Sequence, residues 1–242
     1  MKKIVLSLMA LASFLFAGQV FAHVSYYNLN VNNPSIRAVT SNIGWSDAAD
    51  GDWGDSHHAA WFKFNLAEDS LVSITVSGLN AGTYASVNQN GASINVTPAL
   101  NLTDVGFSLY KGLFPAGAYD SAASLPIPSG KDGRWDALGD TTMANNSAAV
   151  GTVEFKTAVN NSTDNVETLI NFFLTAGDYS LGTGGAFGAT GTVIDADVGD
   201  HLGSYAIQAS LSVQPVPVPG AAWLFGSAVA GLIGFGRRKK IA

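Results

Sequence analysis

The chain has 242 residues, of which 47% are hydrophobic and 12% are charged, and it contains no cysteine. Disulfide bonds and thiolate metal sites are therefore excluded. Six of the 12 Lys and Arg residues lie in the two terminal segments, so the body keeps six cations against all 18 acidic residues, a net charge of −12. Such a surface repels phosphate groups, which argues against nucleic-acid binding.

The N-terminus has the parts of a secretory signal peptide. Two lysines precede an apolar run over residues 4–16, and small or tolerated residues occupy the positions that signal peptidase reads. We expect residues 1–22 to form a signal helix, with signal peptidase cutting between Ala22 and His23. The mature body, residues 23–213, is long enough for one large β domain.

Period-two alternation of apolar residues predicts strands throughout the body. We expect strands at residues 23–31, 36–43, 58–66, 70–76, 105–110, 152–156, 166–174, 179–182 and 205–213. Only a short turn at Glu68-Asp69 separates the third from the fourth, so we expect these two strands to be adjacent and antiparallel. Residues 78–100 are expected to hold one edge strand, and residues 114–148 to form a long loop.

The body shows no helical 3.6-residue pattern of useful length. Many short strands with turn signals between them predict an all-β fold, a β-sandwich or a jelly-roll-like body. Four short segments also occur in the order of landmarks in bacterial pre-peptidase C-terminal domains, which this body resembles: residues 61–66, 106–112, 175–181 and 203–208. The resemblance implies a small secreted β-sandwich that accompanies other modules.

Two acidic clusters are candidate calcium sites. Hard oxygen ligands at short spacing on glycine-containing loops suit Ca²⁺, although the spacing is not that of an EF-hand. The alternative is that these residues form solvated turns and bond to local backbone. The first cluster consists of Asp47, Asp50, Asp52 and Asp55, and the second of Asp195, Asp197 and Asp200.

A histidine at the new N-terminus is a candidate copper ligand. The amine and imidazole of His23 could hold one copper ion, and a second histidine would complete a three-nitrogen site of the kind found in copper-dependent polysaccharide oxygenases. We rank copper below calcium, because any residue can follow a signal cut. His57 and His58 are expected to be ordinary polar residues at a strand entrance.

Enzyme activity has little support in the sequence. There is no Gly-x-Ser-x-Gly elbow, and no spacing of Ser, His and Asp singles out a triad. Four tryptophans are expected on loops or on the outward face of a strand, where their rings could stack on sugars: Trp45, Trp53, Trp61 and Trp135. They could equally fill the space between the sandwich and its loops.

The C-terminal segment, residues 214–242, has the parts of a membrane-sorting tail. A proline box at residues 215–219 precedes 17 uncharged residues, 220–236. As a transmembrane helix these would extend about 25 Å, near the lower limit for a bilayer core. The basic end suits the inner face of a membrane; it consists of Arg237, Arg238, Lys239 and Lys240.

This combination resembles the PEP-CTERM sorting signal of Gram-negative bacteria, with Pro217-Val218-Pro219 in place of the Pro-Glu-Pro box. The resemblance implies transient anchoring in the inner membrane, recognition by an exosortase, and removal of the tail. Delivery to the cell surface or the extracellular polysaccharide matrix would follow. An ordinary C-terminal membrane anchor is the alternative.

The sequence therefore favours an exported, non-enzymatic surface or matrix protein. We expect it to interact with exopolysaccharide or with divalent cations, calcium first. The alternative is a secreted carbohydrate-active enzyme, either with or without a catalytic metal ion.

Overall fold

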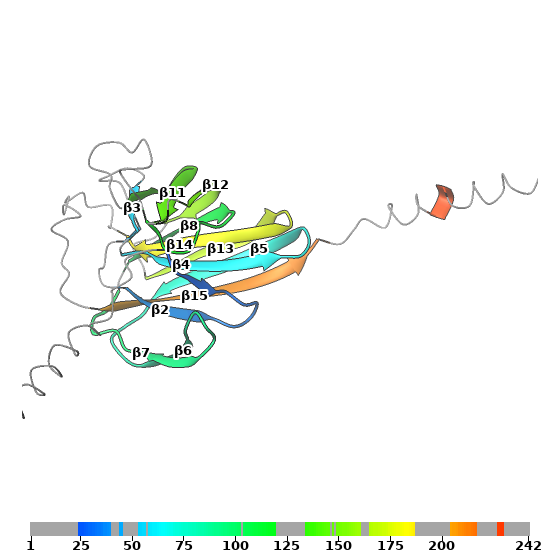
Figure 1. Ribbon diagram of the computed structural model, residues 1–242. Coiled ribbons are helices and arrows are strands. Elements are labelled where there is room, and N and C mark those ends of the chain that lie inside the picture. The colour runs from blue at the N-terminus through cyan, green and yellow to red at the C-terminus, as the bar shows by residue number, and fades with distance from the viewer. Residues whose placement is uncertain are drawn as a thin grey trace, which may run out of the picture.

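The protein is almost entirely β-structure, which confirms the all-β prediction. The computed structural model describes residues 24–39, 44–45, 53–56, 58–102, 104–119, 134–145, 147, 149–160, 165–186, 204–216 and 227–229. Within them lie fifteen strands in two large and two small sheets, and Figure 1 shows the long strands running side by side across the body. No helix among the described residues is long and apolar enough to cross a bilayer.

The larger sheet has seven strands. In spatial order they are β1 (Tyr26–Asn28), β4 (Ala60–Leu66), β14 (Gly177–Gly185), β8 (Val105–Lys111), β12 (Val150–Val159), β11 (Thr141–Asn145) and β9 (Ala118–Tyr119). All its neighbouring strands are antiparallel except β1, which pairs in parallel with β4. The short β1 therefore forms one edge of this sheet.

The second large sheet has four antiparallel strands, and two strand pairs complete the fold. In spatial order the four are β13 (Val166–Leu174), β5 (Ser70–Gly78), β15 (Tyr205–Pro215) and β2 (Ser35–Val39). The pairs are β6 (Tyr84–Val87) with β7 (Ser93–Val96), and β3 (Trp53–Asp55) with β10 (Arg134–Asp136). Figure 1 shows β6 and β7 on the opposite side of the body from β3 and β11.

The two large sheets pack face to face around the main hydrophobic core, which confirms the β-sandwich. Phe62, Phe64 and Leu66 of β4 point into this core, as their alternation predicts. From the other sheet, Val72 and Ile74 of β5 face them. The core is therefore made by the inward faces of strands whose other residues alternate outward.

The seven-stranded sheet is also buried on its second face. There the rings of Trp61, Tyr110 and Trp135 form a second hydrophobic core together with the rings of Trp45 and Phe114 from the loops. The centres of the Trp61 and Trp135 rings are 5.0 Å apart, and their planes meet at 63°. This aromatic core joins the sheet to the layer that contains β3 and β10.

The expectation that the strands flanking Glu68-Asp69 pair with each other is wrong. The first of them, β4, lies in the seven-stranded sheet between β1 and β14, whereas β5 lies in the other sheet between β13 and β15. The turn therefore carries the chain across the core. It is held there by two hydrogen bonds to Asp69, since its Oδ1 accepts from the Ala176 N–H (2.9 Å) and its carbonyl accepts from the Val216 N–H (3.0 Å).

All nine expected strands have counterparts, but the segments expected as loops contain more. Residues 78–100 form a two-stranded hairpin where one edge strand was expected, and residues 114–148 contribute β9, β10 and β11. These strands have two to five residues each. Strands this short hold too few alternating residues to stand out in the sequence, and β9 and β10 also pair with strands far away in the chain.

The last strand also departs from expectation. It continues to Pro215, which lies opposite Ser70, so the first proline of the box does not end the sheet. Proline is tolerated at the end of a strand, because the backbone N–H that it lacks is not needed there for pairing. The signal helix and the rest of the proposed transmembrane tail lie outside the described residues, apart from residues 227–229.

Gly106 provides a test of the second core. A Cβ added to Gly106 would lie 2.2 Å from the Trp45 ring, so we expect Gly106→Ala to lower the free energy of unfolding by about 3 kcal/mol through overpacking. Gly82→Ala is the matched control, because its Cβ would meet nothing closer than 3.4 Å. Urea unfolding of both variants measures the difference. Equal stability of the two would contradict the packing described here.

Candidate functional site

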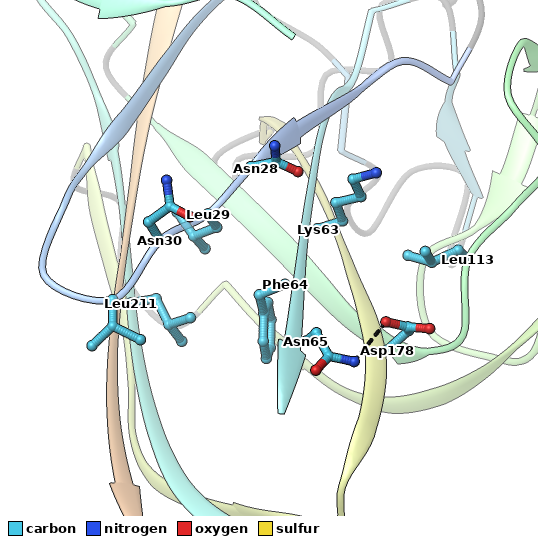
Figure 2. A pocket seen from close by; sticks show the side chains of 10 residues that line it. Asn28, Leu29, Asn30, Lys63, Phe64, Asn65, Leu113, Asp178 and Leu211 are labelled. Carbon is cyan, nitrogen blue, oxygen red and sulfur yellow. Dashed lines mark hydrogen bonds between the residues drawn. The ribbon is translucent and has the colours of Figure 1, made fainter. Parts of the chain in front are cut away.

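An open groove of about 450 Å³ lies where β1, β4 and β14 meet the middle of β15. Its lining includes Leu29, Phe64 and Leu211, which are buried and belong to the main core. Figure 2 shows the side chains that line it. The groove exists because β1 covers only three residues of β4 and leaves the rest of that edge open.

Polar side chains rise from the walls of this groove. Asn28 comes from β1, Lys63 and Asn65 from one face of β4, and Asp178 from β14. The Asn65 amide donates a 2.8 Å hydrogen bond to Asp178 Oδ1, drawn as a dashed line in Figure 2. Alternation within β4 therefore sends Phe64 inward and its two polar neighbours outward.

A second groove, of about 530 Å³, lies at the start of β1. Lys63 lines both grooves, and the second one is completed by Tyr26 and by Gln89 and Asn90 from the β6–β7 turn. The Gln89 amide donates to the hydroxyl of Ser25, which fixes that turn against the start of β1. The two grooves thus lie at the two ends of β1 and share one ammonium group.

Tyr26 forms the inner wall beside Lys63. Its ring packs edge-on against Trp61, with centroids 6.3 Å apart, and the Lys63 Nζ lies 6.0 Å from the Tyr26 centroid. The Tyr26 hydroxyl accepts a hydrogen bond from the Phe114 N–H at 3.0 Å. Burial raises the pKa of Tyr26 to about 12, against the smaller lowering effect of its hydrogen bonds to Phe114 and Ser180. The ring is therefore a neutral, fixed part of the wall.

The groups of the two grooves suit neutral hydroxyl ligands. Each asparagine or glutamine side chain offers two N–H donors and an acceptor oxygen, so it can bond to a sugar hydroxyl in either direction. Lys63 adds donors only, and no ion pair joins it to a carboxylate of the described part of the chain. Asp178 is the one carboxylate among the described residues that line the grooves.

Most sequence-predicted metal ligands lie outside the described residues: Asp47, Asp50, Asp52, Asp195, Asp197 and Asp200, with His23. Asp55 lies in β3 opposite Arg134 of β10. Its carboxylate is 3.6 Å from His58 Nε2. Among the described residues, no three His, Asp or Glu side chains form a group that could hold a metal ion.

The signal and sorting residues cannot be placed either. Ala22 lies outside the described part of the chain, and so do Pro217, Val218, Pro219, Arg237, Arg238, Lys239 and Lys240.

The tryptophans expected as sugar-stacking rings are interior residues. Trp61 and Trp135 have no exposed surface, and Trp45 is 4% exposed. The Trp45 indole donates a 2.8 Å hydrogen bond to the buried Ser108 hydroxyl. These three rings fill the space between sheet and loops, which was the alternative interpretation. The side chain of Trp53 lies outside the described residues.

Sequence reasoning missed the groove as a site. The alternation expected in residues 58–66 puts Lys63 and Asn65 on the face opposite Phe64, as the structure has them, but assigns them no role. The parallel pairing of Asn28 with Lys63 and the contact of Asn65 with Asp178, 113 positions away, bring the lining together. Neither has a local signal in the sequence.

No known family model and no curated protein matches this chain. Chains of solved structures match at low identity, and two of them are as follows. One is CorA, a surface-associated copper-binding protein important in copper acquisition by Methylomicrobium album BG8, with 14% identity, a TM-score of 0.47 and coverage of 79% of this chain and 99% of CorA. The other is MopE, a secreted protein of Methylococcus capsulatus in which an oxidised tryptophan facilitates copper binding; it has 13% identity, a TM-score of 0.42 and coverage of 77% and 87%.

These comparisons contradict the metal expectation from the sequence, which ranked calcium first and copper at His23 below it. Both similar structures belong to copper-binding proteins. With similarity this low, the comparisons transfer no metal site to this chain.

The raised pKa of Tyr26 gives a test of its burial. Folding favours the neutral phenol, so its contribution to stability is complete below pH 10 and is lost as the pH rises towards 12. Between these values we expect the unfolding free energy of the wild-type protein to fall more steeply than that of Tyr26→Phe. Denaturant titrations at several pH values measure both slopes. Identical slopes would show that Tyr26 ionises as it does in the unfolded chain.

Proposed function

We propose that this protein is an exported surface or matrix protein that binds polysaccharide, without turnover, in the groove beside β1. The observation that carries the proposal is the lining: the amides of Asn28 and Asn65 lie near the ammonium group of Lys63 on the outward face of the sheet. Sugars combine C–H faces with hydroxyl groups. The amide donors and acceptors complement the hydroxyl groups, and the half-buried Leu113 offers an apolar contact to the C–H faces.

The lining favours binding over hydrolysis. Most glycoside hydrolases place two carboxyl groups on either side of the scissile bond. In the described lining of the two grooves, Asp178 is the one carboxylate, and Asn65 donates to it. This supports the non-enzymatic function over a carbohydrate-active enzyme.

The proposed destination rests on the two ends of the sequence. Residues 1–22 supply the export signal, and residues 214–242 the sorting tail, which exosortase would remove after transient anchoring in the inner membrane. Removal of the tail also removes four cations. The released body would then be an acidic β-sandwich at the cell surface or in the extracellular matrix.

Substitution of both amides tests the groove. We expect Asn28→Ala/Asn65→Ala to weaken polysaccharide binding by about tenfold or more, since each lost hydrogen bond contributes about 1 kcal/mol. Asn80→Ala removes an exposed amide outside the groove and should bind normally. A glycan array followed by titration calorimetry on the best polysaccharide measures these affinities. Release of shorter saccharides by the wild-type protein, lost in the double variant, would contradict the non-enzymatic function.

The sorting tail has its own test. We expect Pro217→Ala/Pro219→Ala to remain in the membrane fraction with the tail attached, because the proline box is the proposed recognition element. Pro34→Ala, an exposed proline before β2, should be processed normally. Cell fractionation and intact-mass spectrometry distinguish the two forms. Peptides containing Arg237 to Lys240 in the wild-type surface protein would argue for a permanent anchor instead.

A further inference from the structure

The outer face of the four-stranded sheet carries no charge over three strands. The only charged residue of β5, β13 and β15 is Glu167, which is buried. Hydroxyl and amide side chains occupy most outward positions: Ser73, Thr75 and Ser77 on β5, Thr168 on β13, and Gln208, Ser210, Ser212 and Gln214 on β15. In a body with a net charge of −12, this is a large neutral area.

Strand register arranges these groups in rows across the sheet. One row consists of Thr168, Thr75 and Ser210, which lie directly opposite one another on three neighbouring strands. The two threonine hydroxyls are 3.4 Å apart. Rows of this kind repeat every second residue, about 7 Å along the strand, with about 4.8 Å between strands.

An apolar border accompanies the hydroxyl rows on the edge strand β13. Val166, Ile170 and Phe173 are 45%, 70% and 52% exposed. Val166 lies opposite Ser77 and Phe173 opposite Leu71, so both are on the outer face. A bulge between Leu169 and Phe172 shifts the register before the pairing resumes, and the Asn171 N–H there donates to the Ser73 hydroxyl at 3.0 Å.

The hairpin of β6 and β7 covers only the far end of this face. Its Tyr84, Ile94 and Val96 pack on Ile36 of β2 and on Ala206 near the start of β15. The outward residues from Gln208 towards β13 are half-buried or exposed. In the described part of the chain this face is thus accessible, and it is part apolar and part hydroxylic.

We propose that this face binds an uncharged, extended polysaccharide, separately from the groove beside β1. Such a chain offers C–H surfaces to Phe173 and Ile170 and hydroxyls to the Ser, Thr and Gln rows. A polyanionic chain would be repelled by the acidic body. A protein partner or a second copy would have to bury the same rows, and each hydroxyl left without a hydrogen bond would cost free energy.

Adsorption to insoluble β-1,4-glucan (microcrystalline cellulose) tests this proposal with the full-length protein. Thr168→Lys/Ser212→Lys adds two charges to exposed positions of the face and should weaken adsorption at least tenfold. Ser147→Lys/Asn80→Lys adds the same charge at exposed positions elsewhere and should stay within twofold of the wild type. Phe173→Ser should weaken adsorption to cellulose several-fold. Circular dichroism checks that every variant is folded.

The groove variant Asn28→Ala/Asn65→Ala separates this face from the groove. It should adsorb to cellulose like the wild type, whatever its affinity for soluble polysaccharide. The proposal is overturned if the wild type does not adsorb, if both lysine pairs weaken adsorption equally, or if the groove variant abolishes it. Self-association in analytical ultracentrifugation that Thr168→Lys/Ser212→Lys removes would also overturn it, in favour of a second copy.

Discussion

Tryptophan rings lie directly against glycine backbone on the second face of the seven-stranded sheet. The second core and the strands β3 and β10 that pack on it depend on these contacts. A Cβ on Gly182 would lie within 3.0 Å of both the Trp61 and Trp135 rings, and one on Gly54 would overlap Trp135. Only glycine lets backbone and ring approach so closely. The second face of the sheet is therefore covered without a second regular layer of strands. The short β3 and β10 are held in place by the packing of these rings.

The same aromatic core positions the groove. Tyr26 contacts Trp61 at its ring edge and receives the Phe114 N–H on its hydroxyl, so β1 is fixed at the sheet edge through its side chain as well as its backbone. A three-residue parallel edge strand has few hydrogen bonds of its own. Because Asn28 is two residues further along β1, its place opposite Lys63 follows from this anchoring. Packing in the second core thus determines which polar groups face one another at the surface.

The sequence predicts the strands better than their sheets. Alternation identifies β4 and β5 and even their inward faces, because burial of Phe62 and Val72 imposes a period of two. It does not distinguish a hairpin from a chain that crosses between sheets, since both put apolar residues on one side and both need a short turn. The same limit applies to the tryptophans: Trp61 is correctly predicted on the face opposite Phe62, but whether that face is solvated or covered depends on Trp135, which is distant in the chain. The groove depends on similarly distant pairings.

The distribution of charge connects the two proposed polysaccharide surfaces. Acidic residues give the body a net charge of −12, which keeps copies of the protein apart at low ionic strength and is screened beyond about 8 Å at physiological salt. Close contact with another molecule is then favourable only where carboxylates are absent or hydrogen-bonded. This holds on the outer face of β5 and β15 and around Lys63. A molecule with two separate surfaces for neutral sugars can hold two segments of polysaccharide at once, and the second contact gains from the high effective concentration that the first provides. Weak individual sites on a rigid sandwich would therefore suffice for firm retention in a polysaccharide matrix.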